Sequence, residues 1–138
     1  MNTYLKLIGI KAQKAFSKKI ETKLKNKVLY KFASLVKKNK LKILVQNKKD
    51  VNSSKKKKLK ENLISRLQLN NYKIDQIIKS INIIAKLKDP VDLTLDKWKR
   101  PNGLVIKKTT TPLGVIGIIY ESRPNVTSDV SSLCFKSG

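Results

Sequence analysis

The chain has 138 residues, enough for one domain that buries about two-thirds of its unfolded surface. Hydrophobic residues make up 40% of the sequence, which excludes an intrinsically disordered composition. The single cysteine, Cys134, excludes an internal disulfide framework, and the lack of histidine removes the commonest general base and metal ligand. No apolar run approaches the roughly 20 residues that span a bilayer. We expect a cytoplasmic protein with no metal site and no membrane partner.

The net charge of +23 raises nucleic acid as a partner. However, the only arginines are Arg66, Arg100 and Arg123, and aromatic residues are just 6% of the chain. Base readout favours the planar guanidinium group, and single-strand binding favours aromatic rings. We therefore expect a solvated lysine surface and no specific nucleic-acid partner. The alternative is a small basic helical module that binds nucleic acid, with saturable and steeply salt-dependent affinity.

Apolar residues at helical spacing predict five helical segments before residue 90. Asn70 and Asn71 are candidate N-caps of the clearest one, and Asp89-Pro90 ends it, since proline disfavours helix in the preceding residue. The lysine run from Lys55 to Lys58 is interpreted as a solvated turn or helix end. The five segments are Leu5 to Phe16, Leu24 to Val36, Leu41 through Asn47 to the polar stretch Asp50 to Ser54, Leu63 to Leu67, and Ile74 to Ala85.

The pattern changes after residue 90. A turn at Asn102-Gly103 separates extended segments, and the β-branched run from Leu104 to Thr111 predicts a strand. Val115 to Tyr120 is apolar on both faces, as in a buried parallel strand. A final helix follows. It is capped by Asn125 or Thr127, faces inward with Val130, Leu133 and Cys134, and ends at Gly138.

Together these segments predict an α/β fold. Residues 1–90 form a helical layer, and residues 91–138 of the same domain add a β-hairpin or strand and the first strand-helix unit of an incomplete Rossmann-like domain. Ligands of such folds bind at the carboxyl ends of strands, and the N–H groups at a helix start favour anions. The polar elbow from Glu121 to Asn125 is therefore the candidate site. The alternative is that its residues only form a turn and cap the helix.

The elbow also carries a family resemblance. The string PLGVIGIIYESRPNVT at residues 112–127, followed by KSG at 136–138, resembles γ-glutamyl phosphate reductase, also called glutamate-5-semialdehyde dehydrogenase, of the aldehyde dehydrogenase superfamily. The resemblance is looser upstream, where it rests on NKKD at 47–50, SRLQLNNYKI at 65–74, LKDPV at 87–91 and RPNGLVI at 100–106. Ser65 and Asp92 depart from the family pattern, where an acid and a glycine are usual.

The resemblance implies NADPH-dependent reduction of γ-glutamyl phosphate to glutamate-5-semialdehyde and phosphate, on the path to proline. A cysteine thiolate is the nucleophile in that reaction, and in the family it lies much further along the chain than Cys134. Cys134 is therefore interpreted as a structural residue. The resemblance implies that this chain is an N-terminal part of the enzyme and is inactive alone, and that the parent enzyme is a homo-oligomer. Alternatively, an intact dehydrogenase continues beyond Gly138.

Site roles also follow from the resemblance. Asn125 is the candidate oxyanion donor, although it is equally placed to cap the helix. Tyr120, Glu121 and Ser122 are candidates to line the cofactor cleft. Arg123 is the candidate to bind a phosphate or carboxylate group of the substrate; the alternative is an ion pair with Glu121 or Asp129.

Overall fold

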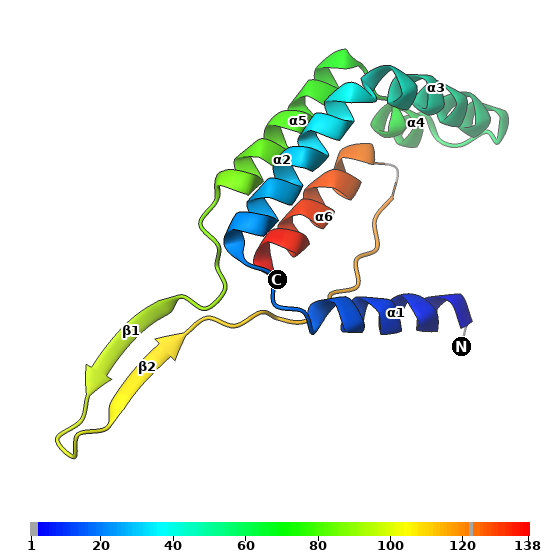
Figure 1. The fold of residues 1–138 in the computed structure, drawn as a ribbon. Coiled ribbons are helices and arrows are strands. Elements are labelled where there is room, and N and C mark those ends of the chain that lie inside the picture. The colour runs from blue at the N-terminus through cyan, green and yellow to red at the C-terminus, as the bar shows by residue number, and fades with distance from the viewer. Residues whose placement is uncertain (1–2, 122) are drawn as a thin grey trace.

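The computed structural model describes residues 3–121 and 123–138. Helices α2, α5 and α6 lie side by side, α3 and α4 sit at one end of them, and α1 and the β-hairpin extend away from the other end (Figure 1). The elements are α1 (Thr3–Phe16), α2 (Thr22–Lys38), α3 (Lys40–Lys56), α4 (Glu61–Leu67), α5 (Asn71–Lys86), β1 (Thr94–Lys99), β2 (Val105–Thr109) and α6 (Pro124–Ser137).

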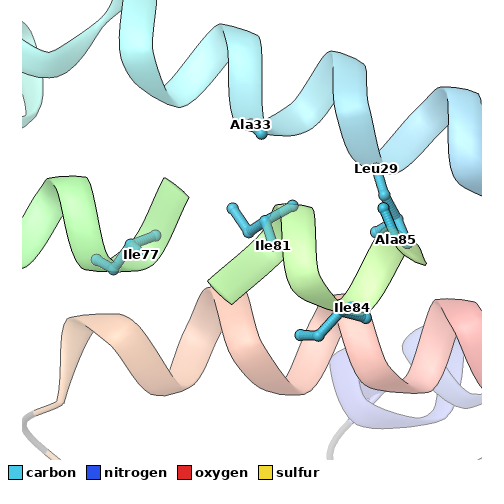
Figure 2. Close-up of a cluster of buried hydrophobic side chains, with 6 residues drawn as sticks. All are labelled: Leu29, Ala33, Ile77, Ile81, Ile84 and Ala85. Carbon is cyan, nitrogen blue, oxygen red and sulfur yellow. The ribbon is translucent and has the colours of Figure 1, made fainter. Parts of the chain in front are cut away.

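The hydrophobic core lies between α2 and α5. Leu29 and Ala33 of α2 face the fully buried Ile81 and Ala85 of α5 (Figure 2). The isoleucines of α5 recur at helical spacing, so one stripe of the helix supplies most of the core. The predicted stripe is confirmed, and so is the cap, because the Asn70 side chain accepts a hydrogen bond of 2.8 Å from the Lys73 backbone N–H.

A second buried cluster is polar and joins α2, α6 and the end of α5. The Asp89 carboxylate accepts hydrogen bonds from Thr22 (2.8 Å) and from the Lys25 ammonium group (3.2 Å), and it forms an ion pair with Lys25 at 3.0 Å. Lys25 also donates to the backbone carbonyl of Lys136 at 3.2 Å, and Lys136 donates to that of Ala85 at 3.1 Å. Both ammonium groups are therefore buried but bonded, as buried charges must be. We call this set the polar junction.

Helix α3 agrees with the sequence prediction. The predicted segment ran from Leu41 through Asn47 to the polar stretch Asp50 to Ser54, and the helix spans Lys40–Lys56. Val51, one turn beyond Asn47, is buried and continues the buried face of the helix. The lysine run does end the helix, and Lys58 adopts a positive φ of 54° just beyond it. The interpretation of that run as a helix end is confirmed.

The two strands form an antiparallel hairpin with its tip at Gly103, which adopts a φ of 87°. Arg100 and Leu104 close the turn through a backbone hydrogen bond of 2.9 Å. The predicted strand from Leu104 to Thr111 is confirmed as β2, and its partner β1 is the extended segment before the turn. Every residue of β1 is exposed, so the hairpin is a ribbon outside the core.

The predicted strand from Val115 to Tyr120 is wrong for this structure. The segment has no regular secondary structure and runs exposed from the hairpin to α6. A strand needs a partner for its backbone, and the described residues supply none beside it. The α/β class is nevertheless confirmed, with six helices and one two-stranded sheet within the described ranges.

Helix α6 packs with a different face from the one predicted. Its buried residues are Ser128, Ser132 and Lys136, whereas Leu133 is 47% exposed and Cys134 is partly buried. The small serines permit close approach to α5, and the polar junction accommodates the lysine. The prediction followed hydrophobicity alone, so it selected the wrong face. Gly138 ends the helix as expected, with a φ of 82°.

Two negative findings apply to residues 3–121 and 123–138. None of their helices is long and apolar enough to cross a membrane. No three histidine, cysteine, aspartate or glutamate side chains among them gather closely enough to hold a metal ion.

Candidate functional site

The elbow that the sequence singled out borders a cavity of about 440 Å³. Tyr120 and Arg123 line it from the elbow, together with Pro124 and Thr127 from the start of α6. The opposite wall comes from α3, the end of α4 and the residues just after it. It consists of Ile43, Gln46, Asn47, Asp50, Leu67 and Leu69. We call this cavity the elbow cavity.

The elbow begins at a hydrogen bond between side chains. The hydroxyl groups of Tyr120 and Thr127 lie 2.7 Å apart, so the last residue of the apolar segment is fastened to the first turn of α6. Pro124 occupies the first helical position. An N–H at that position would have no acceptor within the helix, so the lack of one in proline costs nothing. Arg123 is the N-cap residue and its side chain makes no capping hydrogen bond. Arg123 is exposed and lines the cavity.

The far wall of the cavity is braced by a buried amide. The Asn47 side chain donates to the Leu67 carbonyl at 2.9 Å and accepts from the Leu69 backbone N–H at 2.8 Å. It thereby holds the connection from α4 to α5 against α3. Gln46 donates to Asp50 at 3.1 Å on the same wall, so an acidic residue and Arg123 line the same cavity.

Asn125 lies outside the residues that line the elbow cavity. It is exposed on the first turn of α6 and its side-chain amide donates to the Asp129 carboxylate at 3.3 Å. Ser80 of α5 donates to the other oxygen of that carboxylate at 2.8 Å. Neither Asn125 nor Thr127 caps α6, which corrects the prediction: the helix starts earlier, at Pro124, so Arg123 occupies the cap position.

The remaining candidate residues are Glu121, Ser122 and Cys134. Glu121 is exposed and does not line the cavity. Ser122 lies outside the described residues. Cys134 is a free, partly buried thiol on the ninth residue after Asn125, about 13 Å along the α6 axis. The structure thus brings Tyr120 and Arg123 together and leaves Asn125, Glu121 and Cys134 apart from them.

The sequence interpretation missed the α3 wall. Gln46 and Asp50 stand four residues apart, which places them on one face of α3. The helical spacing of Leu44, Asn47 and Val51, which indicates the packed side of α3, is the signal that could have directed attention to this wall.

Comparison with known proteins gives a consistent answer. No family model matches the chain. Relatives named γ-glutamyl phosphate reductase are 42% identical over 140 residues in Clostridium tetani and 50% identical over 114 residues in a Nitratiruptor species. These alignments take in 100% and 83% of this chain but 33% and 28% of the relatives. The chain therefore spans about a third of the length of the curated relatives that it matches.

Solved structures agree with the sequence matches. The crystal structure of γ-glutamyl phosphate reductase from Thermotoga maritima superposes with a TM-score of 0.86 at 40% identity, over 92% of this chain and 31% of that one. The Saccharomyces cerevisiae enzyme gives 0.85 at 32% identity, over 91% and 33%. These matches give no support to a nucleic-acid-binding module. By sequence and fold, the chain belongs to the γ-glutamyl phosphate reductase family and corresponds to the N-terminal part of its members.

Proposed function

We propose that the chain supplies the N-terminal part of a reductase that uses NADPH to convert γ-glutamyl phosphate to glutamate-5-semialdehyde and phosphate, in the synthesis of proline. The observation that carries this proposal is the YESRPNVT elbow at residues 120–127, placed at the head of α6 in a chain whose relatives bear that name. The parent enzyme is a cytoplasmic homo-oligomer of the aldehyde dehydrogenase superfamily in this proposal.

The elbow cavity supports a role in holding the cofactor or the substrate. Its volume falls in the range of small-molecule sites, and Tyr120 and Arg123, which can supply an aromatic ring and a guanidinium group, both line it. A guanidinium group suits phosphate or carboxylate oxygens. Glu121 and Ser122 complete the proposed cofactor side of the elbow. In this proposal Tyr120 and Arg123 contact part of NADPH, and NADPH would supply the hydride.

Asn125 is the proposed oxyanion donor, because of its place in the YESRPNVT string. A carboxylate only accepts hydrogen bonds, so the contact fixes which end of the Asn125 amide faces Asp129. The NH₂ group carries two hydrogens, and one bond to Asp129 leaves the second for a developing negative charge. A donor held in place before the reaction costs no reorganisation during it, which is the basis of oxyanion stabilisation.

The 138-residue chain is proposed to be inactive alone, because its single thiol does not suit the chemistry. Cys134 is the only cysteine in the sequence and no histidine exists to activate it. It is partly buried in the second half of α6, away from the elbow cavity. The proposed nucleophile is a cysteine that lies further along the family sequence.

The test replaces the matching N-terminal part of the Clostridium tetani reductase with this chain. We expect the hybrid to oxidise NADPH in the presence of γ-glutamyl phosphate, and the 138-residue chain alone to show no such activity. Changing Asn125 to alanine should lower kcat by about 100-fold without unfolding the hybrid. Changing Leu41, an exposed residue of α3, to alanine is the matched control. A folded hybrid without activity, or an active 138-residue chain, would contradict the proposal.

A further inference from the structure

The α3 wall of the elbow cavity carries a carboxylate that pairs with no cation of the described chain. Asp50 lines the cavity, and its Oδ1 atom accepts a hydrogen bond of 3.1 Å from the neutral Gln46 amide. Lys48 and Lys49 directly precede Asp50 in the sequence, yet the ion pairs among residues 3–121 and 123–138 do not include it. Its second oxygen, Oδ2, accepts no hydrogen bond from those residues. Asp50 is exposed, so a ligand in the cavity can reach this open acceptor.

The packing of α3 fixes where Asp50 lies. Asn47 precedes it by three residues, on the same side of the helix, and is 7% exposed. The hydrogen bonds between Asn47 and the backbone of Leu67 and Leu69 join α3 to the connection between α4 and α5. Gln46 holds one oxygen of the carboxylate from the preceding turn. The acceptor is thus in place before a ligand arrives, which lowers the entropic cost of binding.

The cavity suits a ligand that carries charges of both signs. Arg123 lines it too, and Arg123 also belongs to none of the ion pairs within the described ranges. γ-Glutamyl phosphate has one cationic group, the ammonium group on its α-carbon, beside its carboxylate and phosphate groups. An ammonium group has three N–H donors, and hydrogen bonds between charged groups are stronger than those between neutral groups.

We propose that Asp50 binds the α-ammonium group of γ-glutamyl phosphate. The α3 wall thereby selects an amino-acid derivative over an acyl phosphate of the same length that lacks the ammonium group. The inference rests on the proposed function for the identity of the substrate. It adds a specificity residue from a helix about 70 residues before the elbow in the sequence.

Three other roles for Asp50 fit less well. A divalent cation needs several oxygen ligands, and no three histidine, cysteine, aspartate or glutamate side chains in the described ranges gather to supply them. The phosphate groups of NADPH would be repelled by a carboxylate, so they suit the Arg123 side of the cavity. The hydrogen bond between Gln46 and Asp50 can stabilise α3 by itself. Asparagine at position 50 would keep that last role, because its side-chain oxygen also accepts a hydrogen bond.

The experiment measures binding to the full-length hybrid in which this chain replaces the matching part of the Clostridium tetani reductase. The probes are L-glutamate and glutarate, which differ by the α-ammonium group alone. By isothermal titration calorimetry without NADPH, we expect the hybrid to bind L-glutamate about tenfold more tightly than glutarate. Asp50→Asn should abolish this preference by lowering the affinity for L-glutamate about tenfold without lowering that for glutarate. Asp50→Glu, which keeps a carboxylate, should retain a preference for L-glutamate.

Steady-state kinetics give a second readout. Asp50→Asn should raise KM for γ-glutamyl phosphate about tenfold with little change in kcat, because the ammonium group makes the same contact before and during the reaction. KM for NADPH should not change. Glu61→Gln is the matched control, since Glu61 is an exposed acid at the start of α4 that does not line the cavity, and it should leave both affinities and both KM values unchanged.

The outcomes separate this inference from the proposed function. Equal affinities of the hybrid for L-glutamate and glutarate, or equal losses of both in Asp50→Asn, would overturn the inference. A rise in KM for NADPH instead of KM for the substrate would overturn it too. A hybrid that prefers L-glutamate through Asp50 but does not reduce γ-glutamyl phosphate would sink the proposed function and leave the ammonium site standing. An active hybrid whose substrate KM does not respond to Asp50→Asn would do the reverse.

Discussion

Asp89 is the only carboxylate of the polar junction, which also holds the buried ammonium groups of Lys25 and Lys136. We expect Asp89→Asn to lower the free energy of unfolding by about 3 kcal/mol, because it leaves Lys25 buried without its counter-charge. Urea unfolding followed by circular dichroism measures this. The matched control is Asp75→Asn. It breaks the Lys40–Asp75 pair, whose carboxylate is 59% exposed, and should cost less than about 1 kcal/mol. Equal losses for the two variants would refute this account of the junction.

The same carboxylate makes stability depend on pH. Burial favours the neutral form of Asp89, but hydrogen bonds from Thr22, Val91 and Lys25 and the charge of Lys25 outweigh it and lower its pKa. A lowered folded-state pKa stabilises the fold above the unfolded pKa of about 4, and this contribution is lost as the pH falls through the folded-state value. The difference in unfolding free energy between wild type and Asp89→Asn should therefore be constant from about pH 5 to about pH 7. It should shrink below about pH 4. A difference that stays constant down to about pH 2 would count against this carboxylate as its source.

Single residues were predictable where the signal was local. Asn70 was predictable as the cap of α5 because its side chain accepts a hydrogen bond from the backbone N–H of Lys73, only three residues further along the chain. Lys136 was not predictable, because its acceptors come from Asn26 and Ala85, which are far away in the sequence. For the elbow, Tyr120 and Arg123 come from one short stretch of sequence and line one cavity, whereas the Asp50 wall of that cavity comes from a distant helix.

At the scale of elements, the cap of α5 gives a direct test. Asn70→Ala should lower the free energy of unfolding by about 1 kcal/mol, because the Lys73 backbone N–H loses its acceptor. Asn71→Ala, inside the first turn, should be neutral or slightly stabilising, since alanine is the better helix former. Thermal unfolding of both variants checks this. A larger loss for Asn71→Ala than for Asn70→Ala would be inconsistent with Asn70 as the cap.

Helices were predicted better than strands for a physical reason. A helix satisfies its own backbone, so a stripe such as Ile74 to Ala85 determines it locally. A strand needs a neighbour. Val115 to Tyr120 has the composition of a buried strand, but no strand among residues 3–121 and 123–138 pairs with it. The hairpin was predicted correctly because its two strands pair with each other and are joined by the turn at Gly103.

For the whole molecule, stability is concentrated in α2, α5 and α6. We expect backbone amides of α5 to exchange with solvent most slowly, since its side chains form the core, and those of α1 and the hairpin to exchange early. Neither α1 nor β1 has a buried residue. Hydrogen exchange with mass spectrometry of the free chain measures this order. Protection of α1 equal to that of α5 would show that α1 is packed in solution.

The Lys19–Asp92 pair has a mechanical consequence for the two extended parts of the molecule. It ties the linker after α1 to the base of the hairpin across 2.5 Å, between side chains that are 82% and 55% exposed. Exposed pairs weaken as salt screens them, so ionic strength acts on the angle between these two arms. The radius of gyration, measured by small-angle X-ray scattering, should therefore vary with salt in the wild type and much less in Asp92→Asn. We therefore expect rising ionic strength to loosen the contact between the linker after α1 and the base of the hairpin.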